Sequence, residues 1–354
     1  MIQQLELENF TVFKEAALKF SPGLNVVIGE DGTGKSHLLK LIYALACISQ
    51  NAGEQASRRT KAWLGKATAE KLIHTYRPDS LGRLVRRTPG RQRTQVRFLV
   101  ADPNTRGSSP SWFGFSFSTN SKTEVVIEQV PDQWETEAPI FLPTREIISV
   151  FPGFAALYLK HHLEFDETFY DLCLALESPL LRGPRLKETR EMIVALEQTL
   201  RGQVVAENRR FYLRIPGRGN LEMSLVAEGM RKIAMLSFLI KNGSLSSRNQ
   251  LFWDEPEANL NPKLIRLVAR SILDLCNNGI QIFVATHSLF LLKEFDILLA
   301  QPAHAKVKRR YFALAPGEDA VESTQGDSSD DIEPVVMLDE ELTQSDRFME
   351  MENS

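Results

Sequence analysis

The stretch that decides the fold is Leu24-Asn25-Val26-Val27-Ile28-Gly29-Glu30-Asp31-Gly32-Thr33-Gly34-Lys35-Ser36. A buried-strand pattern leads into a glycine-rich loop, and apolar residues at helical spacing follow between Leu38 and Ala46. The loop matches G-x-x-x-x-G-K-[ST] at each fixed position. Because strand, loop and helix occur in this order, the stretch predicts a phosphate-binding site in an α/β fold.

Each residue type in the loop suits a phosphate ligand. Glycines let the backbone wrap so that amide groups point inward, Lys35 brings a cation, and Ser36 offers a hydroxyl to Mg²⁺. The helix that begins here adds the positive end of its dipole. A plain glycine turn would not explain the Lys35-Ser36 pair. We therefore expect ATP to bind at Gly29, Asp31, Gly32, Thr33, Gly34, Lys35, Ser36 and His37.

An acidic motif lies downstream, where Leu251-Phe252-Trp253-Asp254-Glu255-Pro256 ends an apolar run in two carboxylates. In a phosphate-loop protein, Asp254 is expected beside the loop as a Mg²⁺ ligand. Glu255 is expected to face the γ-phosphate and to act as general base for the attacking water. One carboxylate at a strand end is often structural, whereas two adjacent ones favour the catalytic interpretation.

A candidate histidine follows the next strand, in Val284-Ala285-Thr286-His287-Ser288. Parallel strands joined by helices bring their carboxyl ends to one edge of a sheet, where ligands bind. His287 is therefore expected near Asp254, where it would donate to the γ-phosphate and orient the water. A lone histidine is more often an ordinary polar residue, and its place at this edge favours catalysis.

The chain as a whole predicts an α/β fold in several parts. We expect an N-terminal ATPase lobe (1–153), a helical insertion (154–204), a C-terminal ATPase lobe (205–315) and an acidic C-terminal tail (316–354). The first lobe holds the loop, a basic insertion and antiparallel strands. Residues 316–333 are acidic and contain Ser, Gly and Pro, which predicts a flexible stretch.

The composition, with 43% apolar and 25% charged residues in 354, is that of an ordinary soluble protein. No apolar run approaches the roughly 18–20 residues that span a bilayer, and the N-terminus lacks the features of a signal peptide. Cys47, Cys173 and Cys276 are not spaced as metal ligands. These features predict a cytoplasmic protein with no membrane partner.

A net charge of −3 hides two oppositely charged segments. Residues 51–97 hold 12 Lys and Arg against three acidic residues, and residues 317–354 hold 13 acidic residues against Arg347 alone. The basic segment is a candidate for sequence-indifferent binding of nucleic-acid phosphates, because Trp63 and Tyr76 are its only aromatic residues. The acidic segment is a candidate to dock on a basic partner. Simple solvation explains either segment as well.

The three motifs in this order resemble the ATP-binding cassette (ABC) ATPases, and among them the branch of SMC, RecF and overcoming-lysogeny-defect proteins. LELENFTVFKEAALKFSPGLNVVIGEDGTGKS is similar to the start of that branch, and ATHS to its switch-histidine motif. LFWDEPEANLNP resembles its second Walker motif running into the D-loop, and Ser224 to Lys232 resembles its signature. The resemblance covers residues 1–50, 140–150 and 205–315.

The resemblance implies an ABC-type P-loop fold with a mixed central sheet, an antiparallel β lobe and a helical insertion. It implies a homodimer, or a higher homo-oligomer, in which each ATP lies between one chain's phosphate loop and the other chain's signature near Ala227 and Gly229. Asn261 belongs to the D-loop that would cross the interface. Hydrolysis would then release the two chains from each other.

The sequence departs from the family pattern in three places, and two of them bear on the rate of hydrolysis. Ala227 stands where the family usually has serine, and Asp31 where the SMC branch commonly has asparagine. Both predict slower turnover with binding retained. No convincing Q-loop glutamine is present, and Arg145 or Glu146 is a guess for its replacement. An ordinary connection between lobes explains that segment equally well.

Three functions remain open. The first is a nucleotide-gated ATPase that controls a separate effector, a nuclease or toxin, resembling the stand-alone ATPases of prokaryotic defence systems. The second is a RecF-like DNA-repair ATPase that binds duplex DNA, and the third is a slowly hydrolysing scaffold. A transporter subunit is disfavoured because the full Leu-Ser-Gly-Gly signature is missing. A fused nuclease domain does not fit in the 67 residues after His287.

Overall fold

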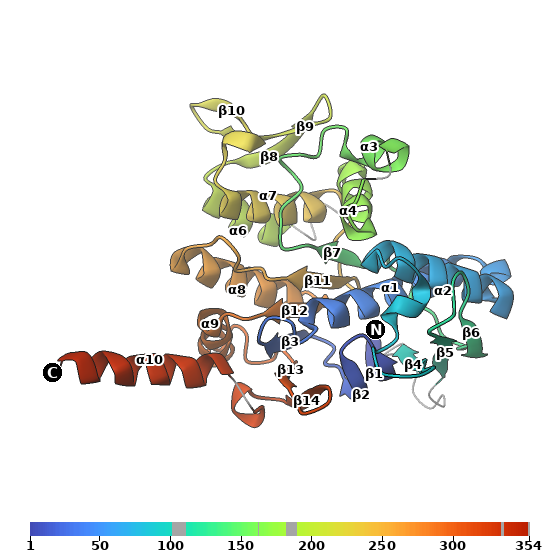
Figure 1. Cartoon of the computed structure of the whole chain (residues 1–354). Coiled ribbons are helices and arrows are strands. Elements are labelled where there is room, and N and C mark those ends of the chain that lie inside the picture. The colour runs from blue at the N-terminus through green and yellow to red at the C-terminus, as the bar shows by residue number, and fades with distance from the viewer. Residues whose placement is uncertain (101–110, 162, 182–189, 334–335, 353–354) are drawn as a thin grey trace.

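The computed structural model describes residues 1–100, 111–161, 163–181, 190–333 and 336–352 (Figure 1). The strands are β1 (Ile2–Phe10), β2 (Phe13–Lys19), β3 (Leu24–Gly29), β4 (Arg93–Val100), β5 (Trp112–Ser118), β6 (Val126–Gln129), β7 (Ile140–Leu142), β8 (Gln203–Glu207), β9 (Arg210–Ile215), β10 (Gly219–Glu222), β11 (Gln250–Asp254), β12 (Gln281–Thr286), β13 (Arg309–Pro316) and β14 (Val321–Gly326). The α-helices are α1 (Lys35–Glu54), α2 (Lys61–Tyr76), α3 (Phe154–His161), α4 (Glu167–Glu177), α6 (Arg190–Leu200), α7 (Glu228–Lys241), α8 (Pro262–Asn277), α9 (Leu289–Leu299) and α10 (Val336–Glu352).

One large sheet organises these elements, with eleven strands in the order β6-β5-β4-β1-β2-β14-β13-β3-β12-β11-β7. Strands β7, β11, β12, β3 and β13 pair parallel in succession. Every residue of β3, β11 and β12 is buried, which explains why their sequences read as continuous apolar runs. Because these three strands are adjacent and parallel, the loops that follow them meet at one edge.

The other half of the large sheet is mainly antiparallel, as the sequence predicts for the first lobe. Strands β2, β1, β4, β5 and β6 pair antiparallel in succession. The two halves meet at β14, which pairs antiparallel with β13 and parallel with β2. The chain therefore has the mixed α/β fold that the ABC-type resemblance implies.

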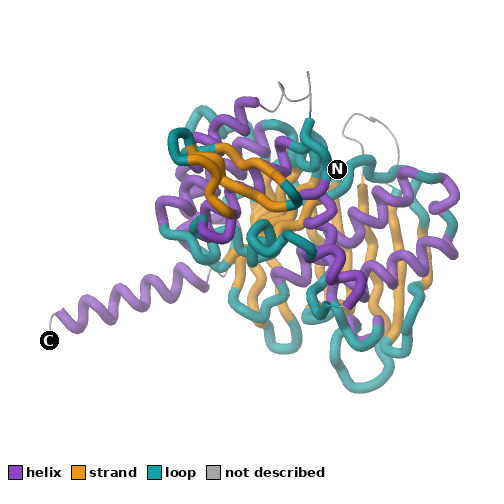
Figure 2. Tube along the Cα trace, turned by 90° about the horizontal axis from the view of Figure 1, so that it is seen from above, coloured by secondary structure: helices purple, strands orange, loops and turns teal. Residues whose placement is uncertain are grey.

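Helices cover the sheet and bury two separate hydrophobic clusters. Val26 and Ile28 of β3 join the cluster formed with α7, α8 and α9, whereas Val27 joins the cluster formed with α1 and α2. This division follows from the strand geometry, in which successive side chains point to opposite faces. Figure 2 shows helices lying across the strands of the large sheet. Within the described residues, no helix is long and apolar enough to cross a membrane.

The helical insertion and a small sheet form the upper part of the molecule in Figure 1. The helical pattern of residues 154–204 corresponds to α3, α4 and α6, with β8 beginning at its end. Strands β8, β9 and β10 make a separate three-stranded antiparallel sheet. Phe211 of this sheet contacts Phe238 of α7 at a ring distance of 4.8 Å, so the small sheet packs against this helix. The four-part division of the chain remains a prediction.

The prediction of a flexible stretch at residues 316–333 is wrong. Six residues of this stretch, Val321–Gly326, form β14 inside the large sheet. The following short 3-10 helix, Ser329–Asp331, has a capping box in which Ser328 and Asp331 each bond to the other's backbone. The composition of a segment does not show which strand it pairs with. β14 is ordered because its backbone pairs with β13, where Phe312 and Ala313 are among its partners. Beyond these residues α10 projects from the body (Figure 1).

We predict that Phe252→Ala lowers the free energy of unfolding by about 3–5 kcal/mol, the usual cost of removing a buried phenyl ring. Phe252 is fully buried in β11, and its ring stacks on Phe283 of β12 at 4.7 Å. The control is Phe348→Ala, because Phe348 in α10 is 56% exposed. Denaturant unfolding followed by fluorescence measures both. Equal effects of the two substitutions would contradict the assigned β11 packing.

Candidate nucleotide-binding and hydrolysis site

The glycine loop has the backbone that its sequence predicts. Gly32 and Gly34 have φ angles of 80° and 90°, a region that residues with a side chain rarely adopt. A Cβ atom at Gly34 would lie 2.6 Å from Cγ2 of Val12, in the turn between β1 and β2. Position 34 therefore requires glycine for its conformation and for the close approach of a neighbouring turn. The helix α1 begins directly after it, at Lys35.

Lys35 is buried inside the loop. Its Nζ donates to the carbonyl oxygens of Gly29 at 2.7 Å and Glu30 at 2.8 Å. Burial lowers the pKa of Lys35, and the nearby carboxylates of Asp31, Glu255, Asp254 and Glu257 act against that shift. Because four carboxylates surround this cation, the charge at the loop favours a ligand that arrives with a divalent metal ion.

Ser36 and Asp254 come together across the large sheet. Ser36 Oγ, in the first turn of α1, donates to Oδ1 of Asp254 at 3.0 Å. Asp254 ends β11, and its burial raises the pKa of the carboxyl group, while the bond from Ser36 opposes that rise. A hydroxyl and a carboxylate oxygen this close are the hard ligands that Mg²⁺ prefers. The two residues thus fit a Mg²⁺ site.

Glu255 and His287 lie against each other at the ends of β11 and β12. His287 Nδ1 is 3.1 Å from Oε1 of Glu255, and the backbone N–H of Glu255 donates to the carbonyl of Ala285 at 2.9 Å. Glu255 has a φ of 47°, a strained conformation for a residue with a side chain. Together with Asp31, these two side chains offer ligand atoms that all lie within 4.8 Å of one another. The structure thus brings Asp31, Glu255 and His287 to the loop.

The signature stretch begins a helix with an open end. Ala227 is the N-cap residue of α7 and makes no side-chain capping bond. A Cβ atom at Gly229 would lie 2.3 Å from Leu260, so α7 approaches the D-loop closely at this glycine. Asn261 caps α8 by accepting from the N–H of Leu264. Among the described residues, no hydrogen bond or ion pair joins Ala227, Gly229 or Asn261 to residues 29–36 of the same chain.

A buried lysine, which sequence reasoning missed, fixes the signature helix to the catalytic turn. Lys232 Nζ donates to the carbonyls of Ala258 at 2.9 Å and Glu255 at 3.3 Å. Burial lowers the pKa of Lys232. Asn259 adds a bond to Glu228 at 3.1 Å. The sequence does hold a sign of this role. Lys232 is a charged residue directly before the apolar run that begins at Ile233, which places it on the buried face of α7.

The segment of Arg145 and Glu146, where a Q-loop glutamine is expected, contacts the same helix α7. Glu146 lies after β7, and its Oε1 forms an ion pair with Nε of Arg231 at 3.0 Å. Its carboxylate also accepts from the backbone and hydroxyl of Ser149. Arg145 is exposed. Glu146 therefore links the end of β7 to α7, and a sensing role for it remains a prediction.

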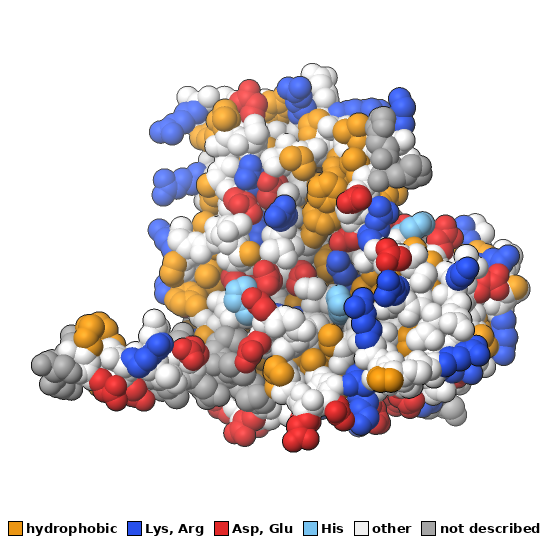
Figure 3. Space-filling model, viewed as in Figure 1, with side chains coloured by type: hydrophobic (Ala, Val, Ile, Leu, Met, Phe, Trp, Pro, Cys, Tyr) orange, Lys and Arg blue, Asp and Glu red, His pale blue; other side chains and the backbone are white. Residues whose placement is uncertain are grey.

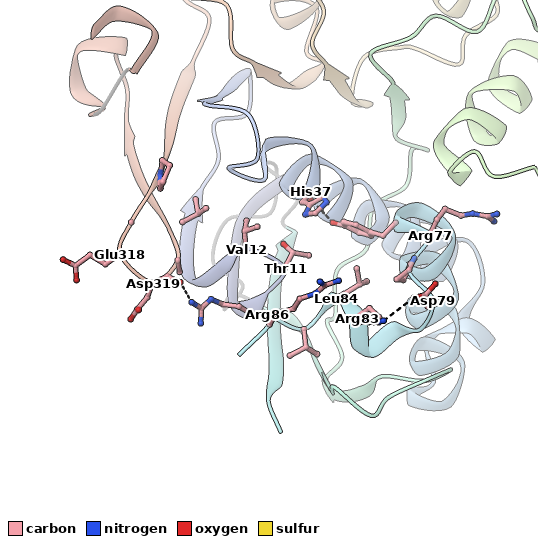
Figure 4. Close-up of a pocket in the computed structure, with 18 residues that line it drawn as sticks. Thr11, Val12, His37, Arg77, Asp79, Arg83, Leu84, Arg86, Glu318 and Asp319 are labelled. Atoms are coloured by element: carbon pink, nitrogen blue, oxygen red, sulfur yellow. Dashed lines mark hydrogen bonds and ion pairs between the residues drawn. The ribbon is translucent and has the colours of Figure 1, made fainter. Parts of the chain in front are cut away.

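A hollow of about 780 Å³ opens beside the glycine loop (Figure 4). Its walls come from the β1–β2 turn, the start of α1, the segment after α2 and the β13–β14 hairpin. Among its lining residues are Thr11, Val12, His37, Tyr76, Arg86 and Asp319. Burial and Lys40 lower the pKa of His37, so a neutral imidazole is favoured there. The hollow continues the phosphate loop outward, from Val12 and His37.

Two sequence families match the chain. Residues 124–293 match a family described as AAA domain, putative AbiEii toxin, type IV TA system. Residues 1–74 match a family described as AAA ATPase domain. The first match contains Asp254, Glu255 and His287, and the second contains the glycine loop. The two matches therefore divide the site between them.

Curated relatives match a short part of the chain. The DNA replication and repair protein RecF of Limosilactobacillus fermentum is 46% identical over 46 residues, or 13% of this chain and 12% of that protein. RecF of Streptococcus equi subsp. zooepidemicus is 31% identical over 101 residues, or 28% of this chain and 24% of that protein. The chain thus matches less than a quarter of the length of either relative.

Solved structures match nearly the whole chain. An SMC head bound to the C-winged helix domain of ScpA has a TM-score of 0.58 at 14% identity, covering 93% of this chain and 98% of that one. An SMC head with an extended coiled coil bound to the C-terminal domain of ScpA, from Pyrococcus furiosus, has a TM-score of 0.55 at 11% identity, covering 100% and 99%. At such identities the likeness concerns the fold. Residues 1–74 and 124–293 are thus similar to AAA-type ATPases, and the chain has the mixed α/β fold of SMC heads.

Proposed function

We propose that the chain binds ATP and Mg²⁺ between two copies of itself, hydrolyses the ATP slowly, and thereby controls a separate effector protein. The observation that carries the proposal is the meeting of Lys35, the Ser36–Asp254 pair and the Glu255–His287 pair at one edge of the parallel strands. The matches to AAA-type ATPases support the hydrolytic activity. Control of an effector goes further than these matches.

The side chains suggest a division of roles. Ser36 and Asp254 would hold Mg²⁺, which supplies positive charge to the β- and γ-phosphates when bound. Lys35 would release the carbonyls of Gly29 and Glu30 and donate to the phosphates instead. Glu255 would accept a proton from the attacking water. His287 contacts that carboxylate through Nδ1, and donation from both ring nitrogens, to Glu255 and to the γ-phosphate, would require the imidazolium form.

The nucleoside would occupy the hollow beside the loop. The hollow begins at His37, in the turn of α1 that follows Ser36, and extends along Tyr76 toward the β13–β14 hairpin. Its volume of about 780 Å³ is in the range of pockets that take small ligands. The assignment gives His37 a place beside the nucleotide.

The open end of α7 supports the dimer. The uncapped N–H groups near Ala227 and Gly229 and the helix dipole suit an anion. No hydrogen bond or ion pair among the described residues joins this helix end to the glycine loop of the same chain. We therefore assign to it the γ-phosphate of an ATP that is bound by the glycine loop of a second chain. Glu228 and Asn259 hold the D-loop beside it. Each chain would thus contribute half of two identical sites.

The role in controlling an effector draws on the named relatives. One matching family is described by a putative AbiEii toxin of a type IV toxin–antitoxin system, and the similar SMC heads are bound to domains of ScpA. These descriptions support an ATPase that works with another protein, and the defence setting is part of our proposal. A scaffold that scarcely turns over differs from this proposal only in its rate of hydrolysis.

The RecF matches favour a second candidate, an ATPase that binds duplex DNA. Much of the basic segment is engaged within the chain, however: Lys71 pairs with Asp171 and Glu167, Arg97 with Glu6, and Arg93 with Glu128. On the face in Figure 3, Lys and Arg are interspersed with acidic side chains. These pairings weaken the case for binding of DNA phosphates through residues 51–97.

We predict that Glu255→Gln lowers kcat by at least about 100-fold, because the general base is lost. ATP binding should persist, and the variant should remain an ATP-bound dimer in size-exclusion chromatography with light scattering. The control is Glu15→Gln, which changes an exposed residue of β2. A scaffold would give the same oligomeric state for Glu255→Gln and the unaltered chain throughout an ATP time course.

We predict that Ala227→Asp prevents the ATP-dependent dimer while leaving the monomer intact. Aspartate is a good N-cap for α7, but its charge would repel a γ-phosphate from the second chain. Ala227→Ser, which adds the hydroxyl found in the family, should keep or strengthen the dimer. Light scattering of both changes in the Glu255→Gln background tests this. An Ala227→Asp dimer with ATP would refute the shared site.

We predict that Arg91→Ala leaves ATP hydrolysis unchanged, with and without duplex DNA. Arg91 is exposed, makes no hydrogen bond or ion pair with described residues and lies outside the hollow assigned to the nucleoside, so it is a member of the basic segment that is well placed to bind DNA. Hydrolysis assays and anisotropy with a labelled duplex at two salt concentrations are the measurement. DNA-stimulated hydrolysis that the variant loses would favour the RecF-like candidate.

A further inference from the structure

A second buried carboxylate lies two residues beyond the proposed general base. Glu257 is 7% exposed, in the turn that follows β11. Its Oε1 accepts a hydrogen bond from the hydroxyl of Thr286, and its Oε2 has no hydrogen-bond partner among the described residues. Lys35, Lys232 and His287 are the cationic or titratable side chains near it, with Glu255 as the neighbouring carboxylate. A buried carboxylate in such a place carries a cost that needs an explanation.

The partner of Glu257 fixes the turn that carries His287. Thr286 is the fully buried last residue of β12, and its hydroxyl donates to Glu257 while accepting from the N–H of Ser288 at 2.9 Å. Ser288 in turn caps α9 by accepting from the N–H of Leu291 at 3.2 Å. His287 lies between the two anchored residues. Its backbone is therefore held on both sides by one hydroxyl group.

The direction of these bonds depends on the carboxylate. A hydroxyl has one proton, and Glu257, as a carboxylate, takes that proton as an acceptor. The lone pairs of Thr286 Oγ1 are then left to face the N–H of Ser288. Without an acceptor at position 257, the hydroxyl is free to rotate and the turn loses its anchor. The side chain of His287 is itself 50% exposed, so little packing would hold it in place.

We propose that Glu257 is a positioning residue for ATP hydrolysis, which acts through the Thr286 hydroxyl to hold His287 against Glu255. The inference rests on the proposed function, because it assigns a role in the same hydrolytic step. It also gives a reason for the acidic residue after Pro256: the D-loop turn and the switch-histidine turn are locked together by a single side-chain bond. The two ends of neighbouring strands thereby move as one unit.

The test compares substitutions that remove the bond with substitutions that keep it. Glu257→Ala and Thr286→Val should each lower kcat by roughly 10- to 100-fold, as expected when a catalytic group shifts by about 1 Å. The KM for ATP should stay within about threefold, because the phosphate loop is untouched. Glu257→Gln and Thr286→Ser keep the acceptor and the hydroxyl, and should retain most of the activity.

A combination with His287→Ala separates positioning from a general loss of structure. If Glu257 acts through His287, Glu257→Ala should lower kcat by less than about twofold further once His287 is already removed. The matched control is Glu135→Ala, which removes another buried carboxylate, one that forms an ion pair with the N-terminal amine at 2.9 Å. It should affect thermal stability as Glu257→Ala does, without the loss of kcat.

The outcomes distinguish this inference from the proposed function. Equal effects of Glu257→Ala with and without His287, or a Glu257→Gln variant as impaired as Glu257→Ala, would refute the positioning role while leaving the ATPase in place. An unaltered chain that does not hydrolyse ATP would refute the proposed function, and the positioning role with it. Loss of kcat that depends on His287 and is restored by Gln and Ser supports both.

Discussion

The parallel pairing of β3, β12 and β11 is the constraint on which the candidate site depends. Thr286 lies beside Ile28, and Asp254 beside Ala285, so the three strands end almost level. The loop, the two carboxylates and the histidine are far apart in sequence, and only this register puts them within hydrogen-bonding distance. Since each strand is buried on both faces, slippage by one residue would place polar side chains in the core.

A dense set of contacts then holds the strand ends in place. Glu255 is bonded through its backbone to β12, Lys232 binds the carbonyls around it, and Thr286 is bonded to Glu257. Glu255 keeps its strained φ because these hydrogen bonds fix its backbone N–H and its carbonyl oxygen. The signature helix participates through Lys232, so the part of the chain that we expect to face a second protomer is continuous with the part that faces its own ATP. Binding and hydrolysis would share one rigid unit.

Sequence patterns identified the residues that meet at these strand ends, because each motif lies at a strand end and motif spacing reports directly on strand and helix boundaries. The glycine loop, Asp254, Glu255 and His287 could all be found in this way, and the mixed sheet followed from the resemblance. Lys232, Glu257 and Thr286 were missed because their roles depend on contacts between turns that no periodicity encodes. Composition also failed at β14, because the strand lies in an acidic stretch that suggests solvent while its backbone completes a sheet. Acidic content describes side chains, whereas strand pairing is made by the main chain.

The position of β14 has a consequence for the order in which the protein can form. This strand joins the two halves of the large sheet, yet its backbone pairing with β2 is the single residue pair Val321 with Phe13, supplemented by side-chain bonds of Gln325 to Ala17 and Lys19. Residues separated by more than 300 positions must therefore meet before the sheet is continuous. During synthesis the ribosome releases the glycine loop early, but the sheet that supports it waits for residues near 326. A nascent chain would expose the unpaired edges of β2 and β3 for most of its translation. During this period the exposed edges could pair with another chain, and a chaperone that covers them would prevent aggregation.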